Sequence, residues 1–399
     1  MATQLYDVIP GRPFGRGTLT TTLTSNPNSF TNCWITSGQT NLTTSDNFAA
    51  NGDILVLHQS YGAASTTEDN WHLCQVVSGG GTTSMVVSPA PSRTFNDGAQ
   101  CTVLKEYFDL TIGSTFGGKS YGATRTDSLK YARGGIIAVA VSNKLTINAT
   151  MHQNGYQGYI SSSDRGGINE WQHFNWWYNN APSGGHVGGA NTTDGGRAAN
   201  GGNSQLGYNG SENQSQTWNG AGAPQTDGCG GGGGHANNGS NGGDGGNGGW
   251  GGLAVGNTTL TSMHMGGGGS GTAGSSAGGG VWTGGSGGGI IMIWAKEIIM
   301  GASGALQSIG GQGYGNNGHA GGSGAGGSIL INTERATLGT NKIDTNSGQN
   351  YDHGGRGSVG RLRINYGVSY SGTFANTSSS AAVDTKLIDS SGAMFFGYY

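Results

Sequence analysis

The sequence has little charge, little proline and no long apolar run. Charged residues make up 10% of the 399 residues and the formal net charge is −3, whereas an ordinary soluble domain is about 25% charged. Weak net charge with 9% aromatic residues excludes a charge-driven disordered chain. Lys and Arg number 18 against 21 acids, so we expect no nucleic-acid partner. Seven prolines exclude collagen, and no apolar run is long enough for membrane insertion.

Cysteine is also scarce, and no targeting signal is visible. The four cysteines, Cys33, Cys74, Cys101 and Cys229, form no CxxC motif. Residues 1–10 lack the basic and apolar regions of a secretory signal peptide. We therefore expect reduced, buried thiols and no export through a signal peptide. The nine histidines lack metal-ligand spacing, so the sequence predicts neither a metal nor a cofactor.

Glycine, by contrast, is abundant. The chain has 84 glycines, about three times the usual share. The stretch 242–252 is strictly periodic, with Asp244, Asn247 and Trp250 each separated by two glycines. A period of three matches the polyproline II helix, and two glycine-only edges would let neighbouring backbones exchange hydrogen bonds. We expect an ordered, polyglycine-II-like bundle. The alternative is a flexible linker, disfavoured because Trp218, Trp250 and Trp282 interrupt the glycines.

Four segments repeat one pattern, in which a glycine is followed by apolar residues at the second and fourth positions. They begin at Gly135, Gly289, Gly327 and Gly360. The matched pairs are Ile137/Val139, Ile291/Ile293, Ile329/Ile331 and Leu362/Ile364, and Gly52 begins a similar segment with Ile54/Val56. Alternation at period two with β-branched residues predicts half-buried strands.

The spacing of these segments favours stacked rungs. The leading glycines are 38 and 33 residues apart from 289 to 360, and 154 apart from 135 to 289. We predict an all-β fold, a β-solenoid or sandwich-like rungs, with a large glycine-rich insertion. Aligned rungs place Lys296 opposite Glu334 and Glu297 opposite Arg335, as exposed corner pairs. An antiparallel sandwich is the open alternative.

One segment is a candidate binding surface. It holds five aromatic residues within eight positions: Trp171, Phe174, Trp176, Trp177 and Tyr178. Such a loop could stack against the sugar rings of a receptor, or it could be a small core beneath the glycine bundle. The carboxylates Glu297, Glu334, Asp344 and Asp352 could serve glycoside hydrolysis, but structural ion pairing explains them better. We predict no catalytic residue.

These segments, in this order, resemble glycine-rich proteins of tailed phages, prophages and environmental bacteria, many of them tail-fibre or receptor-binding proteins. The resemblance covers about residues 50–370 and rests on residues 52–59, 71–76, 103–107, 134–138, 288–293, 326–331 and 360–366 with the glycine runs between them. More distantly, the chain resembles phage adhesins tipped by polyglycine helices. The resemblance implies that loops between glycine helices contact a host receptor. It carries no catalytic motif.

The sequence and this resemblance together predict a non-enzymatic virion structural protein, a phage tail fibre or receptor-binding adhesin, assembled in the host cytoplasm. The expected parts are an attachment segment (1–50), a β-rich base (51–160), the glycine-rich region with aromatic loops (161–289), solenoid rungs (290–375) and a docking tail (376–399). Expected partners are further copies in a homotrimer, other virion proteins at either terminus, and a host-surface glycan or protein. Open alternatives are a capsid-decorating or head-fibre protein, a polysaccharide depolymerase and a bacterial surface or filament protein.

Overall fold

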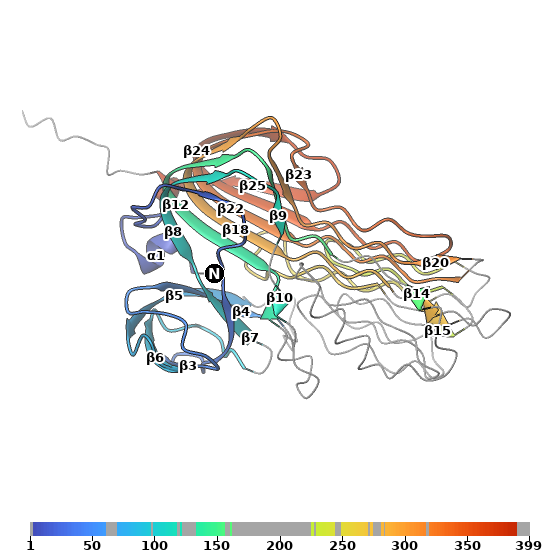
Figure 1. Cartoon of the computed structure of the whole chain (residues 1–399), viewed down its shortest axis with the longest axis horizontal. Helices are drawn as coiled ribbons and strands as arrows, with labels where there is room; N and C mark the ends of the chain where they lie inside the picture. The colour runs from blue at the N-terminus through green and yellow to red at the C-terminus, as the bar shows by residue number, and fades with distance from the viewer. Residues whose placement is uncertain are drawn as a thin grey trace, which may run out of the picture.

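The chain is an all-β protein. The computed structural model describes residues 3–60, 70–96, 99–117, 120–121, 133–155, 160–161, 225–226, 229–243, 249–269, 272–273, 281–282, 284–316 and 319–388. Within these ranges the helical elements are two short ones, α1 (Leu5–Val8) and the 3-10 helix η2 (Thr385–Leu387). Strands dominate the rest, which confirms the predicted all-β class (Figure 1).

Six antiparallel strands close into a barrel near the N-terminus. They are β2 (Phe30–Trp34), β3 (Asn41–Thr44), β4 (Ile54–Gln59), β5 (Trp71–Ser78), β6 (Ser84–Ser88) and β7 (Ala99–Val103). Cys33, Cys74 and Cys101 lie buried in the barrel core and are not joined in disulfides. The strand predicted after Gly52 is present as β4, but all six of its residues are buried, and Ile54 and Val56 pair antiparallel with β5 and β7.

The repeated segments form one parallel sheet of seven strands. Its order is β1 (Thr21–Leu23), β8 (Lys105–Ile112), β12 (Ile136–Ile147), β18 (Ile290–Met300), β22 (Ser328–Thr340), β24 (Arg361–Thr373) and β25 (Ser378–Val383). Ile291 lies opposite Ile329 and Ile329 opposite Leu362, in parallel register. This confirms the predicted parallel ladder between these segments, where a sandwich would pair them antiparallel.

A smaller parallel sheet lies across the core from the seven-stranded one. It contains β9 (Phe116–Gly117), β13 (Thr150–His152), β19 (Ala305–Gln307) and β23 (Ile343–Asp344). The predicted apolar pairs of all four repeats share one buried cluster with Met151, Leu306 and Ile343 from this sheet. Short strands elsewhere are β10 (Ser120–Tyr121), β11 (Arg133–Gly134), β14 (Ile160–Ser161), β15 (Gln225–Thr226), β16 (Thr272–Ala273), β17 (Val281–Trp282), β20 (Gly315–Asn316) and β21 (His319–Ala320).

The first half of β18 is buried on both faces. Ile291 and Ile293 point into the core between the two parallel sheets, which we call the inner face. Ile290, Met292 and Trp294 point the other way, on the outer face, into a second core shared with the barrel and α1. Trp294 packs against Trp71 of the barrel at a ring-centroid distance of 6.3 Å. Two-sided burial explains why this strand reads as a continuous apolar run.

The predicted corner after this run is absent, because β18 continues through it as one strand. Glu297 lies opposite Arg335 in the ladder, as predicted. The prediction that all four corner residues are exposed is wrong, because Glu334 is only 4% exposed. Its carboxylate pairs with Arg335, its own neighbour in the chain. The proposed contact between Lys296 and Glu334 stays a prediction.

The glycine segments lie side by side and exchange backbone hydrogen bonds at steps of three residues. The carbonyls of Cys229, Gly232 and His235 accept from the amides of residues 249, 252 and 255. The amides of residues 321, 324 and 327 donate to Tyr314, Gly311 and Ser308. Three-residue steps are the repeat of an extended threefold helix. The predicted stretch 242–252, apart from residues 244–248, which lie outside the described ranges, bonds in this way and contains no helix. One exception is Gly251, whose amide donates to the Asn241 side chain.

Segment 320–327 is the centre of this arrangement. Its backbone is hydrogen-bonded to six other segments: 230–233, 267, 285–288, 308–314, 348 and 355–361. The packing leaves no room for side chains at some positions. A Cβ added at Gly324 would lie 2.1 Å from the carbonyl oxygen of Ser286, and one at Gly287 would lie 1.7 Å from that of Gly266. Glycine is therefore required here for close backbone approach.

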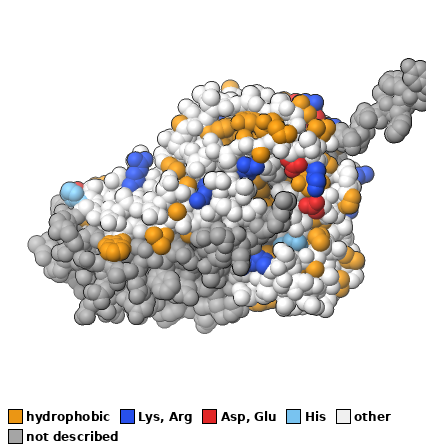
Figure 2. All heavy atoms as spheres, turned by 180° about the vertical axis from the view of Figure 1, so that it is seen from behind, with side chains coloured by type: hydrophobic (Ala, Val, Ile, Leu, Met, Phe, Trp, Pro, Cys, Tyr) orange, Lys and Arg blue, Asp and Glu red, His pale blue; other side chains and the backbone are white. Residues whose placement is uncertain are grey.

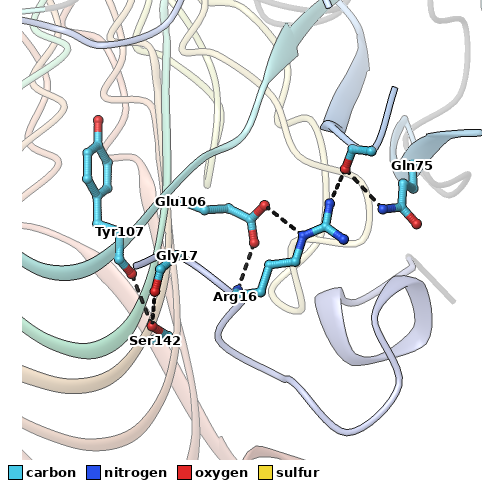
Figure 3. Close-up of polar contacts among 7 residues, drawn as sticks. Arg16, Gly17, Gln75, Glu106, Tyr107 and Ser142 are labelled. Carbon is cyan, nitrogen blue, oxygen red and sulfur yellow. Dashed lines mark hydrogen bonds and ion pairs between the residues drawn. The ribbon is translucent and has the colours of Figure 1, made fainter. Parts of the chain in front are cut away.

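The N-terminal segment joins the barrel to the seven-stranded sheet (Figure 3). The Arg16 amide donates to Glu106 at 2.8 Å and its Nε lies 3.6 Å from the same carboxylate. Its guanidinium also donates to the carbonyl of Gly52, which accepts from Gln75 at 3.0 Å as well. The seven-stranded sheet takes strands from both ends of the chain, from β1 near residue 21 to β25 near residue 383. The barrel contains strands from both sides of residue 50, the expected boundary between the attachment segment and the β-rich base.

Candidate functional site

The aromatic segment predicted as a binding surface lies outside the described residues. Trp171, Phe174, Trp176, Trp177 and Tyr178 all fall between residues 161 and 225. Their role in binding stays a prediction. The described residues nevertheless contain a second set of aromatic side chains, at the ends of the glycine segments.

Each glycine segment has one end near the seven-stranded sheet and one end far from it. Segments 320–327 and 353–360 lead directly into β22 and β24, so residues 320 and 353 mark their far ends. The Gly243 amide donates a hydrogen bond to the His353 carbonyl, and the Gly230 amide donates one to the Ala320 carbonyl. Gly230 and Gly243 therefore lie at the same far end as residues 320 and 353. We call this the distal end; it carries β20 in Figure 1.

Two tyrosines stack at the distal end. The Tyr314 and Tyr351 rings lie 5.6 Å apart between centroids, with planes only 17° from parallel. Tyr351 is 40% exposed, and Tyr314 is half-buried. Trp250 follows the far end of another segment and is 44% exposed. Stacked, partly exposed rings present flat apolar faces of the kind that bind sugars by stacking.

The turn after Tyr351 holds this end in shape. Asp352 adopts a left-handed conformation, with φ 46°, and the Gly354 amide donates to the Tyr351 carbonyl at 2.9 Å. His353 Nε2 lies 3.5 Å from the Asp352 carboxylate, and the His353 side chain is 55% exposed. The distal end therefore combines flat aromatic faces with hydrogen-bonding groups suited to hydroxyls.

The two tyrosines occupy equivalent positions after two neighbouring parallel strands, β19 and β23. Leu306 and Ile343 are partners in the smaller parallel sheet and stand 37 residues apart. Tyr314 and Tyr351 are separated by the same 37 residues. The sequence analysis missed this pair, but aligning the rungs through Leu306 and Ile343 would have found it.

The near end of the glycine segments is fixed to the barrel by buried polar side chains. Asn70 pairs with the backbone of Met263 in both directions, with its Oδ1 accepting at 2.7 Å and its Nδ2 donating at 2.5 Å. The Trp71 indole donates to the carbonyl of Leu260 at 2.8 Å. The side-chain amide of Asn70 thus makes the same pair of hydrogen bonds with Met263 that a neighbouring strand backbone would make.

His58 contributes to the same contact. Its Nε2 lies 3.0 Å from the Met263 carbonyl, which can only accept, so Nε2 carries the proton. Its Nδ1 then accepts from Ser60 Oγ at 2.7 Å. Burial lowers the pKa of His58 to about 4, because the charged form would be taken out of water. At neutral pH the histidine therefore stays uncharged.

Arg361 is the first residue of β24, and His235 of the glycine segment 229–243 lies close to it. The Arg361 guanidinium donates to the carbonyls of Val255 and Ala236, and burial lowers its pKa to about 10. Burial, with the Arg361 charge nearby, also holds the pKa of His235 well below its usual value. These groups hold the near end together rather than forming a reactive site.

The four carboxylates considered for hydrolysis are not brought together as a recognisable pair. Glu334 is ion-paired with Arg335, and Glu297 lies in the ladder opposite Arg335. Asp344 lies in the smaller sheet, where burial raises its pKa. Asp352 is at the distal end, and no group of three or more His, Cys, Asp or Glu in the described ranges could hold a metal ion.

Comparison with protein-family models, curated proteins and solved structures gives no match. In the part of the chain that the structure describes, none of the helices has the length and apolarity needed to cross a bilayer.

Proposed function

We propose that the chain is a non-enzymatic virion protein, a phage tail fibre or receptor-binding adhesin, built as a β-solenoid with a polyglycine-II-like bundle. The parallel register of β8, β12, β18, β22 and β24 supports the solenoid. The three-residue steps of backbone hydrogen bonds between glycine segments support the bundle. In this proposal the sheets form the stalk-side body and the bundle carries the binding loops.

The observation that carries the proposal is the stacked pair Tyr314–Tyr351 at the distal end. Tyr351 is 40% exposed, and adjoining exposed apolar side chains can form an interaction surface. The segments that present them are joined on several sides through backbone bonds. A rigid support reduces the entropy that is lost when a ligand binds.

The expected ligand is a surface glycan. A pyranose ring presents a flat apolar face to an aromatic ring and hydroxyls at its rim. Tyr351 and Trp250 supply exposed rings, and His353 with Asp352 supplies polar groups beside them. The aromatic segment 171–178 would extend the same function, and a proteinaceous receptor is the second possibility.

The proposal includes a homotrimer in the virion, attached to other virion proteins through a terminus. Capsid decoration remains compatible with the same fold. A depolymerase has weaker support, because Glu334 is ion-paired with Arg335 and Glu297 lies opposite Arg335 in the ladder.

The test is binding to a panel of purified bacterial surface polysaccharides. We expect the wild-type protein to bind one class, and the double variant Tyr314→Ala/Tyr351→Ala to lose at least about tenfold in affinity, which corresponds to about 1.4 kcal/mol. Phe108→Ala, at an exposed aromatic residue of β8, is the matched control and should bind normally. Equal binding by both variants would reject the distal site, and release of reducing ends would favour the depolymerase.

A further inference from the structure

One end of the core between the two parallel sheets is uncovered. The seven-stranded sheet ends with β24 and β25, whereas the smaller sheet ends with β23, which pairs only with β19. Leu362, Ile364 and Tyr366 of β24 continue the inner face of the repeated rungs. Their partners on β25 are Ser379, Ala381 and Val383. The inner face of the last strand therefore lacks the second sheet that covers the earlier rungs.

These last inner-face residues are exposed. Val383 is 60% exposed, and Ser379 and Ala381 are also exposed. Beside them, Tyr366, Tyr370 and Phe374 are partly buried and pack against the inner core. Figure 2 shows a band of hydrophobic side chains across the upper part of the molecule seen from behind, the part in which Figure 1 places β24 and β25. A contiguous exposed apolar band indicates an interaction surface.

The chain leaves β25 on the opposite face. Leu387 of η2 packs its backbone against Gly367. The Tyr6 hydroxyl donates to the Asp384 carboxylate at 3.0 Å, and Lys386 lies 4.9 Å from the centre of the Tyr6 ring. Leu5, next to Tyr6 in α1, belongs to the outer-face core shared with the barrel. Residue 388 therefore leads away from the uncovered inner face.

We propose that the exposed inner face of β25, beside the partly buried Tyr366 of β24, receives residues 389–399 of a second copy of this chain. This segment lies outside the described residues, and its sequence contains Met394, Phe395, Phe396, Tyr398 and Tyr399, with Asp389 at its start as its one charged side chain. Eleven extended residues reach about 36 Å, enough to cross the six residues of β25 on a neighbour. Docking onto the same copy would require the segment to turn around the sheet edge first.

The proposed contact joins two different surfaces, a C-terminal segment and a sheet face. Such a head-to-tail contact closes into a ring when the rotation between copies is correct. It thus specifies how the proposed trimer forms, and it rests on the proposed self-association. A ring of three would use every segment and cover every inner face.

Two complementary variants test the proposal. One lacks residues 389–399 and keeps the inner face; the other carries Ala381→Asp and Val383→Asp and keeps the segment. Each variant by itself should be monomeric by light scattering, whereas the full chain should be oligomeric. Mixed together they should form a one-to-one complex, because one supplies the face and the other the segment. Val77→Asp, at an exposed position of the barrel, is the matched control and should stay oligomeric.

Each of the other outcomes would overturn a specific part of the proposal. Oligomers that persist without residues 389–399 would overturn the segment as the contact but leave self-association intact. A mixture that stays monomeric would overturn exchange between copies. A monomeric full chain would reject self-association itself, without bearing on glycan binding. Circular dichroism and the melting temperature show whether the aspartate variant is folded, and a synthetic peptide of residues 389–399 that fails to bind the truncated chain would overturn the proposal independently.

Discussion

Glu297 lies directly opposite Arg335 on the neighbouring parallel strand. Lys144 lies on the other side of Glu297, and Asp109 lies beyond Lys144. Four successive strands therefore carry alternating charges at one level of the sheet. A strand shifted by two residues would keep its apolar side chains on the buried face, so the apolar pattern alone does not fix the register. The row of charges would be broken by such a shift, and it therefore favours the observed register.

Reversing the central charge should destabilise the sheet. Glu297→Lys would place three cations in a row, and we expect a loss of about 0.5–1 kcal/mol in unfolding free energy. The loss should shrink in 1 M salt, because exposed charges are screened. Urea unfolding at low and high salt measures both effects. Glu297→Gln is the control, with a smaller, salt-insensitive change; equal effects of the two substitutions would contradict a role for the row.

Adding one methyl group inside the glycine bundle should be severe. At Gly324 a Cβ would lie 2.1 Å from a backbone oxygen, so Gly324→Ala should cost more than about 3 kcal/mol, at or above the upper range of core overpacking. Gly243 is the matched control, since its nearest neighbour would lie 3.7 Å away. Thermal unfolding of Gly324→Ala and Gly243→Ala measures the difference. Similar melting temperatures would show that these segments do not pack closely.

Acid should weaken the contact between barrel and glycine segments. The pKa of His58 is about 4 in the folded chain and 6.5 when unperturbed, so the unfolded state binds the extra proton between these values. Stability therefore falls as the pH drops below about 6.5 and levels off near 4. The full loss is about 3 kcal/mol.

Urea unfolding at pH 7 and pH 4.5 tests this pH dependence. His58→Gln should show a shallower decline, because its side chain does not titrate. The decline should not vanish, since burial also lowers the pKa of His235 and His72. An unchanged slope in His58→Gln would assign the acid sensitivity to the other histidines.

The aromatic segment remains to be tested by substitution. Trp176→Ala/Trp177→Ala should reduce attachment to host cells without lowering the melting temperature, if these side chains stack against receptor sugars. Flow cytometry with labelled protein measures attachment. A double variant that fails to fold would instead identify the segment as a core beneath the glycine bundle.

Local periodicity was enough to predict the parallel pairing of the repeated strands. The pairs Ile291/Ile293 and Ile329/Ile331 share a register because the leading glycines align them, and the structure pairs them as expected. The same alternation predicted a strand after Gly52, and there Ile54 and Val56 lie in an antiparallel barrel strand. Period-two patterns report which face is buried, but they do not report the direction of the neighbouring strand.

Contacts distant in sequence could not be predicted from pattern. Asn70 and Met263 are 193 residues apart, and nothing near either residue identifies the other. The burial of Glu334 was also invisible, because a strand was mistaken for a corner and Arg335 was assigned only to the neighbouring rung. Tyr314 and Tyr351 were within reach of sequence reasoning, since their spacing equals that of two aligned core residues.

The three-residue steps between glycine segments have a consequence for how such proteins can change in length. A segment lengthened by three residues keeps each remaining amide facing the same neighbour, whereas one or two extra residues would rotate every later amide to a different neighbour. Insertions in multiples of three could therefore move the distal loops outward, by about 9 Å each, while the sheets and barrel stay as they are. The length of the glycine bundle can therefore change in steps of three residues without changing which segments are hydrogen-bonded to one another.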